Sequence, residues 1–580
     1  MKPDRGPPAA RFWQVRQMLR VVTAAIVCAT APTVLADDGT VPLETQPRGL
    51  HWIDWGLIVL YAVSTIGLGV YFSRKQRSTR EYFLGTGNMN SLLIGVSLFA
   101  STLSTISYLG VPGEVMGKGP MNLTSLLMYP VTFFVVGYFL LPVYMRHRVT
   151  SAYELLEDRL GLGARLLAAS VFLLTRLVWM AMMVYLASKA MVWMMGVDPQ
   201  WIPLIAAVTG VVSVVYTSLG GMRAVVITDL MQTLLLYGGA LLVLIMVTWD
   251  YGGFGWLPTT WQSHWDTQPI FSFDPGVRIT VVGVMLSGFV YSVAAAGADQ
   301  ISVQRFMATR DAAAARRAQA AHLIVGAVVV LTLVLVGFAL MSYFQTHADQ
   351  LPANLSFEQN ADELYPRFIA FHLPVGVSGL VVAAMFAAAM SSIDSGVNSI
   401  TAVVMTDFLD RFGLGPKTER GHVRAAQFLA LLIGVVVVLS SNYIRFIEGN
   451  IAEVTGKAPS SLLPSVFALF ILALFVPFVR PAGALIGCFC GCTSGLAIAF
   501  SGPLVALLWR WFGVDPVVFG TEFITRVDPI SGQEWTTVDD PISFQWVGIS
   551  ALLVALAVGV SLSWVQSRWE RPSDQQTDRG

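Results

Sequence analysis

Apolar runs of about 20 residues recur along the chain, separated by polar connections, and a helix of that length crosses a bilayer's hydrocarbon core. The runs predict about 13 membrane helices. We place them at residues 54–73, 90–116, 121–145, 164–195, 201–218, 224–248, 277–297, 320–344, 375–402, 425–444, 460–478, 483–511 and 544–566. The expected fold class is therefore an all-α polytopic membrane protein.

The composition agrees with this pattern. Of 580 residues, 55% are hydrophobic and 12% are charged, and the mean hydropathy is +0.65. A soluble domain carries about twice that share of charged residues. The formal net charge is zero, which argues against nucleic acid as a partner. The lipid membrane is thus the expected environment, and nothing in the sequence indicates an obligate protein partner.

The N-terminus reads as a secretory signal peptide at residues 1–36. Basic residues precede an apolar stretch that ends in Val34-Leu35-Ala36, a small-residue cleavage pattern. Cleavage would leave residues 37–53 outside the cytoplasm. A short uncleaved anchor is the alternative.

Basic residues set the expected orientation. They gather in alternate connections, for example at 74–80, 305–317, 417–424 and 568–571, where the positive-inside rule places the cytoplasm. The longer polar loops at about 249–276, 345–373 and 512–543 then lie outside, and the tail 567–580 lies in the cytoplasm. The expected location is the plasma or inner membrane.

Two apolar segments look interrupted. Leu93–Gly119 contains five closely spaced hydroxyl residues followed by Tyr108, and Val281–Asp299 contains Gly288, Tyr291, Ser292 and Gly297. Paired broken helices indicate a transporter built from inverted repeats. We expect a core at 90–478, with repeats 90–248 and 277–478, a first peripheral helix at 54–73 and two more peripheral helices within 483–566.

A stripe of small hydroxyl residues marks the segment 387–407, AAAMSSIDSGVNSITAVVMTD. Asp394 lies beside this stripe. The stripe members fall at helical spacing and are Ala388, Ser391, Ser392, Ser395 and Ser399. Carbonyl oxygens freed by a break at Ala100–Ser104, placed against this stripe, would form an oxygen pocket suited to Na⁺. The alternative is that the serines serve helix packing or bond to their own backbone.

Two ionisable residues are expected inside the membrane. Asp229 lies about two turns beyond Gly220-Gly221, and Arg176 lies near the middle of its helix. Such groups are costly in hydrocarbon and are by default candidates for a functional site. Asp229 could instead be a structural partner of a hydroxyl or a cation. Arg176 suits a carboxylate, and its alternatives are snorkelling or pairing with Asp229 or Asp394.

At these residues the chain resembles the sodium/solute symporter family, which includes sodium-coupled glucose, proline, iodide and monocarboxylate transporters. The resemblance covers about residues 50–500 and rests on TSLGGMRAVVITDLMQ (217–232), DQISVQR (299–305) and the serine segment. It implies a leucine-transporter-like core of two inverted five-helix repeats.

The resemblance also implies site residues. It places sodium-binding carbonyls at Ala100, Leu103 and Ala388, and sodium-binding hydroxyls at Ser391 and Ser392. It places Asp229 on the sodium exit path. A second sodium site would use Asp229 and Ser395, but Asp394 replaces one of its expected hydroxyls, which leaves one or two ions per cycle open.

The substrate region departs from the sugar transporters. Their sugar-binding positions align with Ile106, Ser107, Ala295 and Gly326, which would leave sugar hydroxyls poorly paired. We therefore expect a small organic anion, with a sugar or polyol as the alternative. The expected substrate residues are Thr102, Ser104, Thr105, Ser107, Tyr108, Arg176, Tyr291 and Ser292.

The resulting hypothesis is a Na⁺-coupled symporter that imports a small solute by alternating access. An enzyme is not expected, because the chain has no HExxH or GxSxG motif. A sensor would need an output domain, for which only about 14 residues follow the last expected helix. The sequence leaves H⁺ open as the coupling ion, although an oxygen site without a carboxylate favours Na⁺.

Overall fold

The computed structural model describes residues 50–73, 88–102, 105–147, 149, 151–266, 271–351, 355–444, 457, 460–527 and 534–569. The signal peptide predicted at 1–36, most of the segment 37–53 and most of the tail 567–580 lie outside these ranges. Two predicted site residues, Leu103 and Ser104, also lie outside them.

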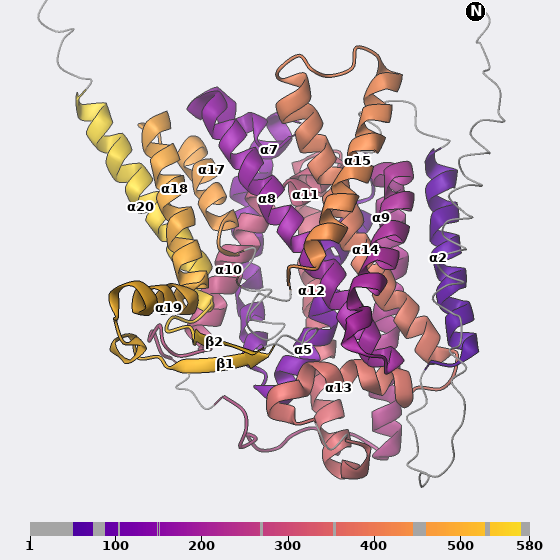
Figure 1. The fold of residues 1–580 in the computed structure, drawn as a ribbon. Coiled ribbons are helices and arrows are strands. Elements are labelled where there is room, and N and C mark those ends of the chain that lie inside the picture. Colours follow the sequence, from indigo (N-terminus) through magenta and orange to yellow (C-terminus); the bar gives the residue numbers. More distant parts are fainter. Residues whose placement is uncertain are drawn as a thin grey trace, which may run out of the picture. The chain divides into compact units, whose positions relative to one another are not determined.

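Helices make up nearly all of the described chain (Figure 1). The first part contains α2 (Trp52–Ser73), α4 (Ser91–Thr102), α5 (Thr105–Gly117), η1 (Met121–Met128), α6 (Tyr129–Val135), η2 (Val136–Leu140), α7 (Leu141–His147), α8 (Glu154–Met195), η3 (Pro199–Trp201) and α9 (Ile202–Asp250). The middle contains α10 (Val281–Ala298), α11 (Gln300–Met307), α12 (Ala312–Thr346), η4 (Ala348–Gln350), α13 (Phe357–Phe371), α14 (Val377–Val403), η5 (Val404–Asp410) and α15 (Glu419–Ser441). The last part contains α17 (Leu463–Phe475), α18 (Pro481–Ala499), α19 (Ser501–Phe512), η7 (Pro516–Phe519), β1 (Phe523–Val527), β2 (Glu534–Val538) and α20 (Gln545–Trp569).

Eight helices of the described chain are long and apolar enough to cross a membrane, and α4 with α5 forms one further span bent by 60°. Four shorter apolar helices accompany them, at Trp52–Gly67, Pro199–Val214, Val377–Phe386 and Leu463–Phe475. Together they account for every stretch from which a membrane helix was predicted. The protein is therefore a multi-pass membrane protein, and its described membrane-spanning segments are helices.

Helix α9 contains two stretches that were expected as separate helices, 201–218 and 224–248. Ser213 donates a hydrogen bond to Asp394 at 3.2 Å, while Asp229 shares the guanidinium of Arg305 with Ser395, the next residue after Asp394. Residues of both stretches therefore lie near Asp394 and Ser395 of α14, and α9 packs against α14.

Two outer connections have more structure than a polar loop. The stretch 345–373 contains α13, and the stretch 512–543 contains the antiparallel hairpin β1–β2, in which Thr525 pairs with Thr536. The single helix expected at 483–511 is divided into the apolar span α18 and the shorter helix α19, because Phe500 leaves helical geometry with ψ 37°.

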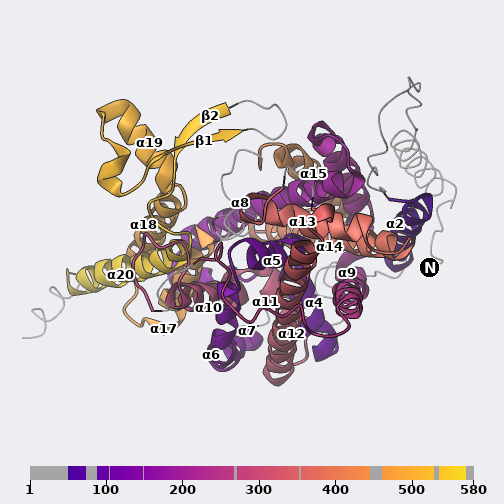
Figure 2. The ribbon, with the colours of Figure 1, turned by 90° about the horizontal axis from the view of Figure 1, so that it is seen from below.

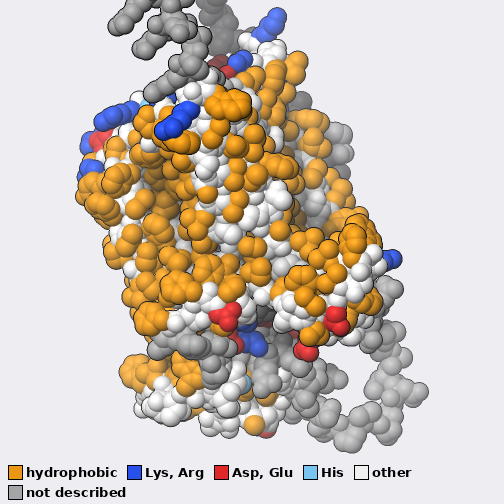
Figure 3. Space-filling view, turned by 90° about the vertical axis from the view of Figure 1, so that its left-hand side faces the viewer, with side chains coloured by type: hydrophobic (Ala, Val, Ile, Leu, Met, Phe, Trp, Pro, Cys, Tyr) orange, Lys and Arg blue, Asp and Glu red, His pale blue; other side chains and the backbone are white. Residues whose placement is uncertain are grey.

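The described part of the chain has two polar ends and an apolar middle. The η5–α15 connection and the end of α20 lie at one end, whereas α13, α19 and the β1–β2 hairpin lie at the other (Figure 1). Figure 3 shows hydrophobic side chains over the middle of one face, with Lys and Arg near its upper end. We call the end with the α15 start the basic end, and it is the end predicted to face the cytoplasm.

Helix α14 lies at the centre and packs against α2, α4, α8, α9 and α15 (Figures 1 and 2). Small residues allow this close packing. A Cβ on Gly396 of α14 would overlap Met180 of α8, and a Cβ on Gly95 of α4 would lie 2.5 Å from the Cβ of Ala321 in α12. The serine segment is thereby enclosed by the helices that carry the other candidate residues.

Candidate functional site

The break between α4 and α5 lies beside the serine stripe of α14, as the sequence suggested. The hydroxyls of Ser101 in α4 and Ser395 in α14 are 3.0 Å apart, and both residues are buried. From this contact, α4 continues toward its end at Thr102. Ser392 lies about one turn before Ser395 in α14. This register sets the last carbonyls of α4 beside the turn 388–392.

Ser392 is the member of the stripe whose hydroxyl lacks a hydrogen-bond partner among the described residues. Its side chain is 2% exposed, and its buried hydroxyl has no hydrogen bond to any described residue. Ala100, which is 6% exposed, lies near the end of α4, where carbonyls lack partners in the helix. The side chains of Ala388 and Ser391 lie outside the described set. A buried hydroxyl without a protein partner suits a cation ligand.

Other hydroxyls of the region behave as the packing alternative expected. Ser101 donates to the carbonyl of Ser97 at 2.8 Å, and Thr102 donates to the carbonyl of Phe99 at 2.9 Å. Ser399 donates to Gln304 at 2.9 Å. Hydrogen bonding within the protein thus explains these serines and Thr102, but not Ser392.

A buried arginine joins four elements next to this site. Arg305 of α11, 1% exposed, donates from Nε to the hydroxyl of Ser97 at 2.9 Å and from Nη2 to Ser395 at 2.7 Å. The same Nη2 lies 3.3 Å from Asp229 Oδ2, to which Ser97 also donates at 2.6 Å. The guanidinium is therefore surrounded by the groups that a second sodium ion would use.

Arg305 corrects one prediction from the sequence. It was counted among the cytoplasmic basic residues, but the structure buries it against Asp229, which is fully buried. The ion pair offsets the cost of both charges. The DQISVQR motif carried the signal available in the sequence, because Arg305 directly follows Gln304 in a polar stretch that begins immediately after the apolar run 281–298.

Asp394 faces a different neighbour from Asp229. It is fully buried and accepts a hydrogen bond from Ser213 in the first half of α9 at 3.2 Å. Ser213 also lies 3.5 Å from the carbonyl of Met390. The Asp394 carboxylate thus contacts the first half of α9.

Arg176 has a partner that the sequence did not suggest. Its guanidinium forms an ion pair with Asp299, whose side chain is 2% exposed. Asp299 lies between α10 and α11 and also accepts from the N–H of Ile301 at 3.0 Å, so it caps α11. Tyr291 lies within electrostatic reach of Arg176. A bound carboxylate would therefore have to share Arg176 with Asp299.

The remaining polar residues of DQISVQR fix the break between α10 and α11. Gln300 accepts from the N–H of Ala152 at 2.8 Å, and Gln304 accepts from Ser399. Asp299, Gln300, Gln304 and Arg305 therefore connect this region to several other elements. This explains the motif as a positioning device for the Arg305 and Asp299 ion pairs.

The predicted substrate residues are only partly brought together. Tyr108 of α5 is fully buried beside Gly239 of α9 and lies 5.3 Å, between ring centroids, from Tyr365 of α13. Ser107, Tyr291 and Ser292 are half-buried. Ser104 lies outside the described residues, as does the side chain of Thr105. Tyr108 thus belongs to the α13 side, whereas Tyr291 lies near Arg176.

The chain is similar to known sodium symporters. The model of the Sodium:solute symporter family matches residues 82–491. The sodium/sialic acid symporter SiaT of Proteus mirabilis is 28% identical over 480 residues, covering 82% of this chain and 95% of its own. Human sodium-coupled monocarboxylate transporter 2 is 28% identical over 454 residues, covering 77% of this chain and 72% of its own.

A solved structure of a Na⁺-coupled sialic acid symporter, in a substrate-bound outward-open state, has the same fold. The TM-score is 0.70 at 24% identity, with 89% of this chain and 98% of that chain covered. The predicted fold class, an all-helical transporter of this type, is confirmed.

Proposed function

Because the chain belongs to the sodium:solute symporter family, whose members are transporters and not enzymes, we propose that it imports a small organic anion together with Na⁺. The chain is a Na⁺-coupled solute symporter in the sense of this family. We propose in addition that the solute is an organic anion, that Na⁺ binds between α4 and α14, and that transport is inward. In this account Na⁺ is a transported co-substrate.

The observation that carries the sodium site is the Ser392 hydroxyl, which is buried, lies in register with the end of α4 and has no partner among the described residues. Carbonyls of Ala100, Leu103 and Ala388 and the hydroxyls of Ser391 and Ser392 would supply about five oxygen ligands, which is within reach of what a hard cation requires. Na⁺ bound there would hold α4 against α14.

The anion is supported by relatives and by one buried cation. Sialic acid is in the name of two relatives, SiaT and the NanT symporter of Aliivibrio fischeri, and monocarboxylate is in the name of three more. Arg176 could pair with the substrate carboxylate while it also pairs with Asp299. The sodium/glucose cotransporter of Vibrio parahaemolyticus, 28% identical over 471 residues, keeps a sugar as the competing substrate class.

The proposed cycle is ordered. Na⁺ binds first and fixes the α4–α5 break, which completes the solute pocket between this break and α10. Both ligands together favour the inward-facing state more than either alone, which is coupling in the thermodynamic sense. The membrane potential adds about 2.3 kcal/mol per charge per 100 mV to inward movement.

The test is a thermal-stability screen of the purified protein in NaCl and in choline chloride, with carboxylates, sugars, polyols and amino acids. A ligand of the folded state raises the midpoint by mass action. We expect a shift by a carboxylate only when Na⁺ is present, and its loss in Arg176→Gln. A Na⁺-dependent shift by a sugar would keep the symporter and discard the anion, and a carboxylate shift that survives Arg176→Gln would remove that residue from the pocket.

A further inference from the structure

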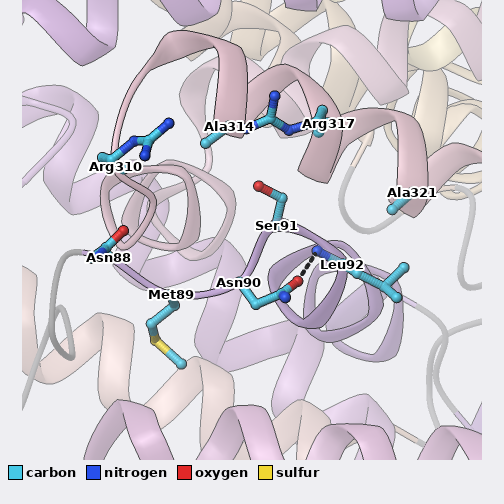
Figure 4. A pocket seen from close by; sticks show the side chains of 9 residues that line it. All are labelled: Asn88, Met89, Asn90, Ser91, Leu92, Arg310, Ala314, Arg317 and Ala321. Carbon is cyan, nitrogen blue, oxygen red and sulfur yellow. Dashed lines mark hydrogen bonds between the residues drawn. The ribbon is translucent and has the colours of Figure 1, made fainter.

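A pocket of about 590 Å³ opens at the basic end, between the start of α4 and the start of α12. Residues 88–92 form one wall. The other wall is formed by Arg310, Ala314, Arg317 and Ala321 (Figure 4). No described acidic side chain lines it. The pocket is separate from the candidate sodium site, which lies at the opposite end of α4.

Close helix packing explains why the pocket forms there. A Cβ on Gly95 would lie 2.6 Å from the carbonyl oxygen of Ala318, so α4 and α12 touch at this level. One turn earlier, near Ser91 and Ala314, the helices separate and leave the pocket. It is therefore fixed by the helix crossing and not by a loop alone.

The polar part of the pocket is suited to an anion. Arg317 is exposed, and Arg310, whose side chain is 68% exposed, pairs with Asp311 at 2.9 Å. The N–H of Ala314 and the guanidinium of Arg310 lower the pKa of Asp311, so this neighbour keeps its negative charge. Two arginines against one carboxylate leave an excess positive charge. The amide of Asn90 caps the first turn of α4 by accepting from the N–H of Leu92 at 2.8 Å.

An apolar stripe continues from the pocket along α12. Arg317, Ala321, Ile324, Val328 and Leu331 are spaced by four, three, four and three residues, which places them on one helix face. Ile324 is 64% exposed, and Val328 and Leu331 are each 47% exposed. Leu92, on the facing wall, is 61% exposed. The stripe thus leads from the cationic pocket into the region that the hydrocarbon of the bilayer occupies.

We propose that this pocket binds the headgroup of an anionic phospholipid of the leaflet at the basic end, with an acyl chain lying along Ile324, Val328 and Leu331. The phosphate would contact Arg310 and Arg317, since each basic residue near an anionic membrane surface contributes about 1 kcal/mol of attraction. Because the pocket is bordered by both α4 and α12, the bound lipid ties the start of the broken helix to α12. With the orientation that the basic residues predict, this is the cytoplasmic leaflet.

The test measures binding by the purified full chain in detergent. Short-chain phosphatidylglycerol is titrated while the thermal midpoint is followed, with short-chain phosphatidylcholine and inorganic phosphate at equal ionic strength as the comparison ligands. The double variant Arg310→Gln/Arg317→Gln removes both headgroup contacts. Its matched control is Arg420→Gln/Arg424→Gln, which removes two exposed charges from the start of α15 at the same end.

We expect phosphatidylglycerol, and neither comparison ligand, to raise the midpoint. Its affinity should fall about 30-fold in the Arg310/Arg317 variant and stay unchanged in the control, given the usual contribution of two basic residues near anionic lipid. Ser91→Trp, which places a bulky side chain in the pocket between its two walls and keeps both arginines, should also weaken the shift, and it serves if the double variant folds poorly.

Three results would overturn the proposal. An equal loss of affinity in both double variants would mean diffuse charge attraction. An equal, variant-sensitive shift with inorganic phosphate would mean a free-anion site and not a lipid site. No shift with phosphatidylglycerol, or a shift that survives Ser91→Trp, would remove the pocket from the account.

Discussion

Replacing Ser392 by alanine should weaken Na⁺ binding while leaving the Na⁺-free fold intact. The Ser392 hydroxyl is buried and makes no hydrogen bond to a described residue, so its removal breaks no bond within that part of the protein. The Na⁺-free free energy of unfolding should therefore change by less than about 1 kcal/mol. The variant loses one of about five oxygen ligands of the ion.

The size of the Na⁺ effect follows from the charge of the ligand. A polar contact to a charged group is worth about 1.5–3 kcal/mol, so the Na⁺ concentration for half-maximal effect should rise about 10- to 150-fold. The assay is the thermal midpoint against NaCl concentration, with choline chloride keeping total salt constant. The same titration of solute uptake in proteoliposomes gives the functional value.

The matched control is Ser399→Ala, two turns further along α14. Its hydroxyl donates to Gln304 at 2.9 Å, so its loss leaves a buried amide oxygen without that donor and should lower the Na⁺-free stability by about 1 kcal/mol. Its Na⁺ dependence should remain normal. An unchanged Na⁺ half-saturation in Ser392→Ala, or a Na⁺-free stability loss as large as that of the control, would refute the reasoning.

Three further predictions concern the fold around the site. Arg305→Gln leaves the Asp229 carboxylate buried without its cation and should lower the free energy of unfolding by about 3–5 kcal/mol; adding Asp229→Asn should restore most of it, and a thermal melt in which the double variant is no better than the single would contradict the ion pair. Gly95→Ala should lower stability by about 1–3 kcal/mol, because the new Cβ meets α12, whereas Gly56→Ala, which meets nothing within 4 Å, should change it little; equal melts would contradict the α4–α12 contact. His372, which follows α13, has its pKa lowered by burial and by nearby His347, so it takes up a proton more readily when unfolded; stability should fall as pH drops below about 6.5, the ordinary histidine value, and this slope should shrink in His372→Gln, measured by melts between pH 8 and 5.

The sequence predicted the membrane helices well because each is an apolar run long enough to span a bilayer. It also predicted a break at Ala100–Ser104, from five hydroxyl residues within seven positions of an apolar run, and α4 ends at Thr102. It did not predict α13 or the β1–β2 hairpin. Both lie in polar connections, where no strict apolar period marks an element.

The candidate site was predicted only in part, for a physical reason. The serine stripe can be read from helical spacing, because its members share one helix. The partners of Asp229 and Arg176 cannot, since Arg305 lies 76 residues from Asp229 and the Asp299–Arg176 pair joins two different helices. Such pairing depends on how the helices pack against each other, and the local sequence of either helix does not predict that packing.

The measurement that tests the central claim most directly is solute uptake into proteoliposomes under an inward Na⁺ gradient. It is compared with uptake under an equal choline gradient and under an inward H⁺ gradient without Na⁺. We predict that an organic acid accumulates only with Na⁺ and that ²²Na⁺ enters with it. The Ser392→Ala variant should require far more Na⁺ for the same rate of uptake. Equal uptake in choline, or uptake driven as well by H⁺ alone, would contradict Na⁺ coupling at this site.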